Sequence, residues 1–196
     1  MTITDGYKEI LQSLHERHKW GSTGGGYAGD SIVQLLTDRP EIKTILDYGC
    51  GEGSLKTHVE SAGITDREWT LYDPGMKGLD KRPSGKFDLV ITTDVLEHVE
   101  PEMQEKVILE LMEYTDKVMF NEIACYATNR YFPNGPYKGM DLHINLRAPD
   151  MWRWIIESLA APRGFQRLRS EVTLLDGYKV RYLSILWREH EVRNIG

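Results

Sequence analysis

Apolar positions in the first forty residues recur at helical spacing in two segments. In Asp5–Lys19 they fall on one face of a predicted helix. These positions are Tyr7, Ile10, Leu11 and Leu14. The stretch "DSIVQLLTDRP" predicts a second helix that begins at Asp30 or Ser31 and ends before Pro40. The glycine-rich residues between the two helices, "KWGSTGGGYAGD", predict a loop.

Beyond Lys43 the pattern changes to short apolar runs that alternate with helical patterns. The predicted strands are "KTILDY", "EWTLYD", "KFDLVITTD", "DKVMFNEI", "FQRLRSEVTLL" and "KVRYLSILWRE". The predicted helices are "SLKTHVESAG", "EPEMQEKVILELMEYT" and "APDMWRWIIESLAA". Strands separated by helices predict an α/β fold with a mostly parallel sheet covered on both faces. The Asp176-Gly177 turn predicts a final hairpin that adds one antiparallel strand.

Composition narrows the class of protein. The chain has 196 residues, 40% of them hydrophobic and 28% charged, as expected for one globular domain. Its net charge of −6 disfavours non-specific nucleic-acid binding, although arginines gather between Arg147 and Arg169. Two cysteines exclude a disulfide framework and a four-cysteine zinc site. No signal-like stretch or membrane-length apolar run is present, so we expect a cytoplasmic protein with no membrane partner.

The stretch "ILDYGCGEGSL" carries the clearest chemical signal. Three alternate glycines, Gly49, Gly51 and Gly53, follow a predicted buried strand and open a helix. Glycine permits a sharp turn and close approach of a ligand, and the helix N-terminus offers unpaired N–H groups. Asp47 precedes the glycines, and Asp73 ends the next predicted strand, where an acid accepts hydrogen bonds from a ribose diol.

This glycine spacing and the later "FDLVITTDVLEHV" resemble the class I S-adenosylmethionine-dependent methyltransferases. The resemblance implies a Rossmann-like doubly wound fold, S-adenosylmethionine as cofactor and S-adenosylhomocysteine as product. It places Asp47, Cys50 and the three glycines around the methionine part of the cofactor, and Asp73 on the ribose. Four further positions would lie beside the cofactor on the same resemblance: Tyr72, Pro74, Asp94 and Val95.

One segment departs from that family's pattern. Only fourteen residues, Asp73 to Lys86, separate the second and third predicted strands, and they include three glycines and two prolines. This length is near the minimum for a parallel crossover, so we predict that the usual helix and edge strand are reduced to a loop. Asp80 is then a weak substitute for the acid that the family often places against adenine.

Candidate catalytic residues lie where the predicted strand ends open. Asp94, Glu97, His98 and His143 are candidates by position, and an unperturbed histidine titrates near neutral pH, as a general base requires. The residues also resemble the metal-binding acid, Glu-His pair and later histidine of small-RNA 3′-end 2′-O-methyltransferases and ubiquinone-pathway O-methyltransferases. On that resemblance Asp94, Glu97, His98 and His143 would hold a divalent metal ion. Packed, structural histidines remain the alternative.

Two segments could cover the site. We expect residues 1–40 to form a helical N-terminal cap or lid on a catalytic domain of residues 41–196, with Trp20, Gly21 and Tyr27 as contacts to cofactor or substrate. A plain linker is the alternative for the glycine-rich stretch. The loop from Ala124 to Arg147 is long enough to be functional, and we interpret it as a substrate lid.

The predicted function is methyl transfer to a hydroxyl or amine of a small molecule. A first alternative is a 2′-O-methyltransferase of RNA or nucleotides, with the arginines as phosphate contacts. A second is a non-catalytic module that binds S-adenosylmethionine. A nicotinamide oxidoreductase is disfavoured by the glycine spacing.

Overall fold

A six-stranded mixed sheet forms the centre of the molecule. The computed structural model describes residues 3–17, 21–22 and 24–188. The strands are β1 (Thr44–Tyr48), β2 (Glu68–Tyr72), β3 (Phe87–Thr93), β4 (Thr115–Ala124), β5 (Phe165–Leu175) and β6 (Lys179–Arg188). Their order is β2-β1-β3-β4-β6-β5, and β6 is antiparallel to both neighbours. The predicted mostly parallel sheet with one antiparallel strand near the C-terminus is therefore confirmed.

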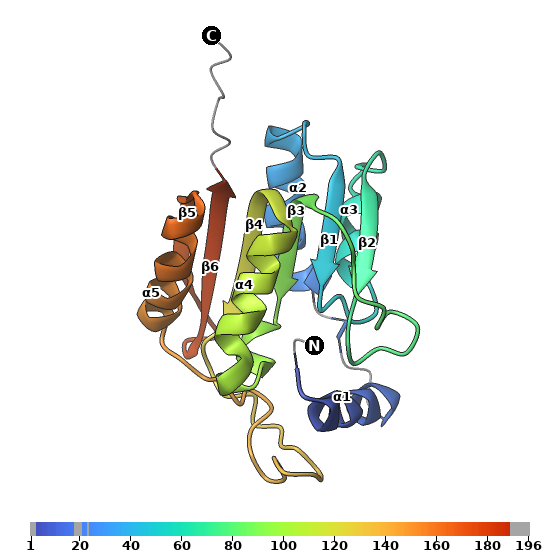
Figure 1. Cartoon of the computed structure of the whole chain (residues 1–196), viewed down its shortest axis with the longest axis vertical. Helices are drawn as coiled ribbons and strands as arrows, with labels where there is room; N and C mark the ends of the chain where they lie inside the picture. Colours follow the sequence, from blue (N-terminus) through green and yellow to red (C-terminus); the bar gives the residue numbers. More distant parts are fainter. Residues whose placement is uncertain (1–2, 18–20, 23, 189–196) are drawn as a thin grey trace.

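Helices cover both faces of this sheet (Figure 1). The helices are α1 (Asp5–Arg17), α2 (Gly24–Asp38), α3 (Ser54–Ser61), α4 (Gln104–Tyr114) and α5 (Pro149–Ala160), with short 3₁₀ turns at Leu96–His98, Pro101–Met103 and Ala161–Arg163. One apolar cluster joins α4 and α5 to the sheet, and a second joins α2 and α3 to the opposite face. Consecutive β3 residues such as Leu89 and Val90 enter opposite clusters, which explains the unbroken apolar run from Leu89 to Ile91. None of the described helices combines the length and hydrophobicity needed to traverse a bilayer.

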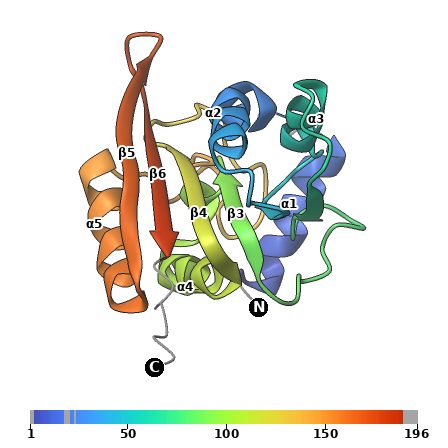
Figure 2. The same ribbon diagram turned by 90° about the horizontal axis from the view of Figure 1, so that it is seen from above.

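The segment after β2 confirms the predicted shortening. Residues 73–86 contain no helix or strand, so β2 is one edge of the sheet. Strand β5 is the other edge, and the β5–β6 hairpin extends past the neighbouring strands (Figure 2).

The glycine-rich stretch does not form the predicted loop. Helix α2 begins at Gly24, six residues before Asp30, so most of the glycines are helical. A Cβ atom added to Gly25 would lie 2.8 Å from the backbone oxygen of Ser54 in α3, and one on Gly29 would lie 2.4 Å from the His58 ring. The glycines therefore allow α2 and α3 to pack closely, which local sequence rules do not reveal.

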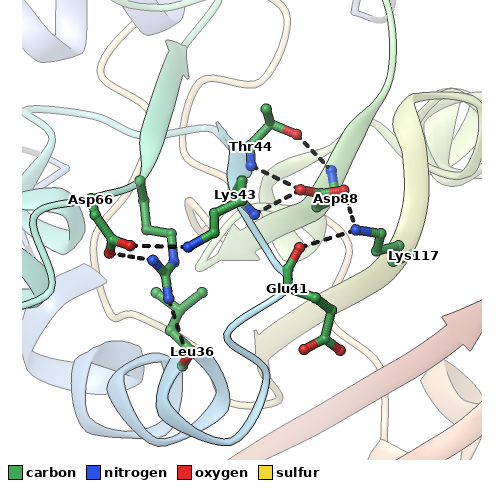
Figure 3. A network of polar contacts seen from close by, with 8 residues as sticks. Leu36, Glu41, Lys43, Thr44, Asp66, Asp88 and Lys117 are labelled. Carbon is green, nitrogen blue, oxygen red and sulfur yellow. Dashed lines mark hydrogen bonds and ion pairs between the residues drawn. The ribbon is translucent and has the colours of Figure 1, made fainter.

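An ionic network fixes the amino ends of the parallel strands. The Asp88 carboxylate at the start of β3 accepts hydrogen bonds from the backbone N–H groups of Lys43 (2.7 Å) and Thr44 (3.0 Å), and pairs with Lys117 of β4 (2.8 Å) (Figure 3). Burial alone would raise the pKa of Asp88, but these donors outweigh it and lower the pKa. The network aligns β1, β3 and β4 at the end of the sheet opposite the candidate site.

Helix α1 lies across the carboxyl ends of the parallel strands, beside the loop of residues 124–147 (Figure 1). Together they form a third apolar cluster of Ile3, Tyr7, Ile10, Leu11, Leu14, Phe132 and Leu142. The carboxylate of Glu100, which is fully buried, accepts hydrogen bonds from Thr4 in the N-terminal segment and from Tyr137 in the loop. The N-terminal segment and the loop thus form a joint cover. The domain boundary at residue 40 stays a prediction.

Candidate functional site

The turn between β1 and α3 has the conformation that its glycines predict. Gly49, Gly51 and Gly53 have φ angles of 81°, 51° and 74°, which a residue with a side chain rarely adopts. The N–H of Gly49 donates to the carbonyl of Tyr72 at 2.7 Å, which ties the turn to the end of β2. A Cβ atom on Gly49 would lie 2.4 Å from a methyl group of Val95, so this turn has no room for alanine.

Two buried carboxylates stand beside this turn. Asp73 accepts hydrogen bonds from the backbone N–H groups of Gly51 (2.9 Å) and Gly75 (2.8 Å). Asp47 is 3% exposed, and its Oδ2 atom has no hydrogen-bond partner among the described residues. Burial, helped by the charge of Asp73, raises the pKa of Asp47 to about 7. A buried acceptor without a donor is what a missing cationic or hydrogen-bonding ligand would leave behind.

The segment before α2 touches the glycine turn directly. The carbonyl of Gly21 accepts a hydrogen bond from the N–H of Glu52 at 3.0 Å. A Cβ atom on Gly51 would lie 2.2 Å from that carbonyl oxygen, and one on Gly21 would lie 2.8 Å from the Cα of Gly51. The proposed contact residue Trp20 lies outside the described residues.

Asp94 lies across the cavity at the end of β3, in a left-handed conformation with φ of 54°. Its carboxylate accepts a hydrogen bond from Arg181 of β6 at 2.6 Å. Arg181 is 2% exposed, also donates to Glu122 at 2.8 Å, and lies under the ring of Tyr27 with its guanidinium carbon 4.0 Å from the ring centre. Burial alone would lower the pKa of Arg181, but the two carboxylates outweigh it and raise the pKa. The sequence analysis missed Arg181 and Glu122, because nothing local marks a strand arginine as the partner of acids 59 and 87 residues away.

The predicted Glu97, His98 and His143 come together behind Asp94. One potential ligand atom from each lies within 4.8 Å of the other two. The Nδ1 atoms of His98 and His143 lie 2.8 Å and 2.5 Å from the carbonyls of Leu142 and Tyr126. With Nδ1–H donated to a carbonyl, Nε2 is the nitrogen that remains for a metal or an acceptor. The cluster that the structure describes does not include Asp94.

Burial shifts the titration of this cluster. Burial, and then the neighbouring His143, lowers the pKa of His98 to about 4. Burial and the charge of Asp94 raise the pKa of Glu97, whose Oε2 atom has no hydrogen-bond partner among the described residues. His98 is therefore neutral at neutral pH but only weakly basic, which differs from the near-neutral pKa expected from its type.

A cavity of about 380 Å³ connects these groups. The predicted residues that line it are Gly21, Tyr27, Asp47, Gly49, Cys50, Asp73, Pro74, Asp94, Val95, His98 and His143. Gly51, Gly53, Glu97 and Tyr72 do not line the cavity, and Tyr72 packs in the core with its ring centre 4.9 Å from that of Tyr48. Asp80 does not line the cavity and pairs with Lys8 at 2.8 Å. The volume of the cavity lies in the range of small-molecule binding sites.

A family profile described as a methyltransferase domain matches residues 16–159. The chain belongs to this family. The membership confirms the resemblance to the class I methyltransferases, and the chain is a methyltransferase. No curated protein shows significant similarity to the sequence.

Solved structures share the fold of this methyltransferase at low sequence identity. The plantazolicin methyltransferase BpumL, solved with a pentazolic desmethylPZN analog and S-adenosylhomocysteine, has a TM-score of 0.62 at 12% identity, and the match covers 94% of this chain and 92% of that one. The Burkholderia thailandensis 1,6-didemethyltoxoflavin-N1-methyltransferase has a TM-score of 0.58 at 14% identity, covering 94% and 89%. The magnesium protoporphyrin IX methyltransferase of Synechocystis PCC 6803 has a TM-score of 0.56 at 17% identity, covering 96% and 86%.

Proposed function

We propose that the protein transfers a methyl group from S-adenosylmethionine to a hydroxyl or amine of a small molecule. The observation that carries this proposal is the buried Asp47 carboxylate, which lacks a described donor and lines a cavity beside a glycine turn. The cofactor carries an ammonium group and a sulfonium that such a carboxylate would attract. The structural neighbours solved with S-adenosylhomocysteine lend support.

The residues divide into a cofactor end and an acceptor end. Asp47 and the glycine turn would hold the methionine part, while Asp73 would accept hydrogen bonds from the ribose. Bound S-adenosylmethionine supplies an electrophilic methyl group. Val95 and Asp94 would border the space where the acceptor approaches. The joint cover formed by α1 and the loop of residues 124–147 would exclude water. The protein's contribution is alignment of two reactants in one closed space.

A metal-assisted reaction on a hydroxyl is a second candidate, favoured by the Glu97–His98–His143 cluster. The donor set fits a divalent cation, because two imidazoles and a buried carboxylate oxygen without a donor converge. A cation there would lower the pKa of an acceptor hydroxyl. It would also balance the charge of Glu97, whose burial otherwise opposes ionisation.

RNA is the less favoured acceptor. The arginines expected to contact phosphates have local partners in the described structure. Arg153 pairs with Asp150, Arg167 with Glu157 and Arg169 with Glu171, while Arg147 donates to Gln104 and Arg163 to the Leu159 carbonyl. Three of these five arginines are paired with acids, which reduces the net positive charge that the stretch offers to a phosphate backbone.

Calorimetric titration with S-adenosylmethionine, S-adenosylhomocysteine and NAD tests the cofactor. Asp73→Asn should weaken binding of both sulfur compounds at least tenfold, because hydrogen bonds to a charged group contribute about 1.5–3 kcal/mol. Asp80→Asn is the matched control, since Asp80 lies outside the cavity lining. Binding of NAD alone would refute the proposal. Cofactor binding without release of S-adenosylhomocysteine on any acceptor would favour the non-catalytic alternative.

A further inference from the structure

The cavity lining carries both negative and positive side chains. Its acids are Asp47 near the end of β1, Asp73 just after β2 and Asp94 just after β3. Among the described residues that line it, the lysines and arginines are Arg130 and Lys179 alone. Arg130 comes from the loop after β4, and Lys179 begins β6. Both cations therefore come from segments that carry none of these acids.

We propose that the methyl acceptor is a small molecule with a carboxylate or phosphate group, which Arg130 and Lys179 bind. The claim that this molecule is methylated rests on the proposed function, whereas the claim of an anion site rests on the residues that line the cavity. A guanidinium offers paired N–H donors in a plane that matches these anions, and an ammonium adds a compact charge.

Neither cation is committed to a buried acid. The Arg130 guanidinium forms no ion pair with any acid in the described part of the chain. Lys179 lies 3.3 Å from Asp176, whose side chain is 73% exposed. Exposed pairs of this kind contribute only about 0–1 kcal/mol, so an anion inside the cavity can replace Asp176.

The backbone that carries Arg130 is held in place. The Asp141 carboxylate accepts hydrogen bonds from the N–H groups of Thr128 (3.1 Å), Asn129 (2.9 Å) and His143 (2.9 Å). Asn129 has a left-handed φ of 57°. The arginine thus extends from a defined turn that is tied to His143, which also lines the cavity.

Aromatic rings flank the second cation. The Lys179 Nζ atom lies 5.9 Å from the ring centre of Tyr126 and 5.7 Å from that of Tyr178, and both tyrosines line the cavity. The rings supply flat apolar surface beside the positive charge. An acceptor with a planar apolar body and one anionic group matches this arrangement.

Matched pairs of fragments test the proposal. Benzoate and benzamide, and phenyl phosphate and phenol, are titrated by NMR into the protein saturated with S-adenosylhomocysteine. We expect each anion to bind at least fivefold more tightly than its neutral partner. Arg130→Gln and Lys179→Gln should each reduce this preference at least threefold, without changing the affinity of the neutral fragments. Lys138→Gln removes an exposed lysine from the same loop that does not line the cavity, and should change nothing.

The outcomes separate the possible errors. If no anion binds more tightly than its neutral partner, or if the preference survives in the Arg130→Gln/Lys179→Gln double variant, the anion site is refuted. A short single-stranded RNA that binds more tightly than every small anion, and loses affinity in the same variants, would overturn the small-molecule assignment. If S-adenosylhomocysteine fails to bind while the anion preference persists, the proposed function fails and the anion site stands.

Discussion

Two adjacent glycines of α2 provide a sharp test of how its packing against α3 limits side-chain size. In Gly25→Ala the new methyl group would lie 2.8 Å from the backbone oxygen of Ser54, which cannot rotate away. In Gly26→Ala it would have no neighbour within 4 Å. The two positions are next to each other in one helix, so they differ mainly in the space available.

The magnitudes follow from that difference. Replacing glycine by alanine within a helix stabilises by up to about 1 kcal/mol. Gly26→Ala should therefore raise the free energy of unfolding by that amount. Overpacking costs about 1–3 kcal/mol, so Gly25→Ala should leave the protein no more stable than the wild type, or up to about 2 kcal/mol less stable. Because the propensity gain is common to both, the gap between the variants isolates the steric cost.

Urea denaturation with common m values measures this gap, and thermal melting gives an independent reading. For a chain of this length a 2 kcal/mol gap corresponds to roughly 4–8 °C in melting temperature. Equal shifts in the two variants would refute the close helix contact. A loss of stability in Gly26→Ala would refute the helical assignment of the glycine-rich stretch.

Three further predictions concern the site. S-adenosylmethionine affinity should fall about tenfold from pH 8 to pH 6. The reason is that a cation is best bound by ionised Asp47, whose folded-state pKa of about 7 leaves it mostly protonated at pH 6. Calorimetry at several pH values checks this, and the same pH dependence of affinity in Asp47→Asn would contradict it. Arg181→Ala should lower the free energy of unfolding by about 3–5 kcal/mol, because it leaves Asp94 and Glu122 without their buried cation; a loss below 1 kcal/mol in urea denaturation would count against this. Burial raises the pKa of the Cys50 thiol, so iodoacetamide at pH 8.5 should alkylate it far more slowly in the folded protein than in urea, as mass spectrometry would show.

Local patterns in the sequence account for much of the fold. The apolar runs of β1, β3 and β4, the glycine turn and the shortened segment after β2 all depend on residues close together in the chain. The start of α2 could not be predicted in this way. Glycine is a poor helix former, and only the closeness of α3 in space explains Gly25 and Gly29 within a helix.

The residues of the candidate site show the same difference between local sequence signals and contacts that only the folded chain creates. Asp47, Asp73 and Asp94 were predicted because each lies at the carboxyl end of a predicted strand, and parallel strands bring their carboxyl ends together. Arg181 and Lys179 were not predicted, because β6 enters the sheet only after a long excursion of the chain. The lowered pKa of His98 likewise depends on its burial and on the neighbouring His143, which residue type alone does not reveal.

The contact between Gly21 and Gly51 joins positions thirty residues apart with no space for a methyl group at either one. A side chain at one position cannot be accommodated by adjusting the other, because backbone atoms form both sides of the contact. In closely related sequences, the two glycines should therefore persist together or be lost together, and chains that lose them should also differ in how the N-terminal segment enters α2. Covariation at this pair would trace which relatives keep the segment against the turn.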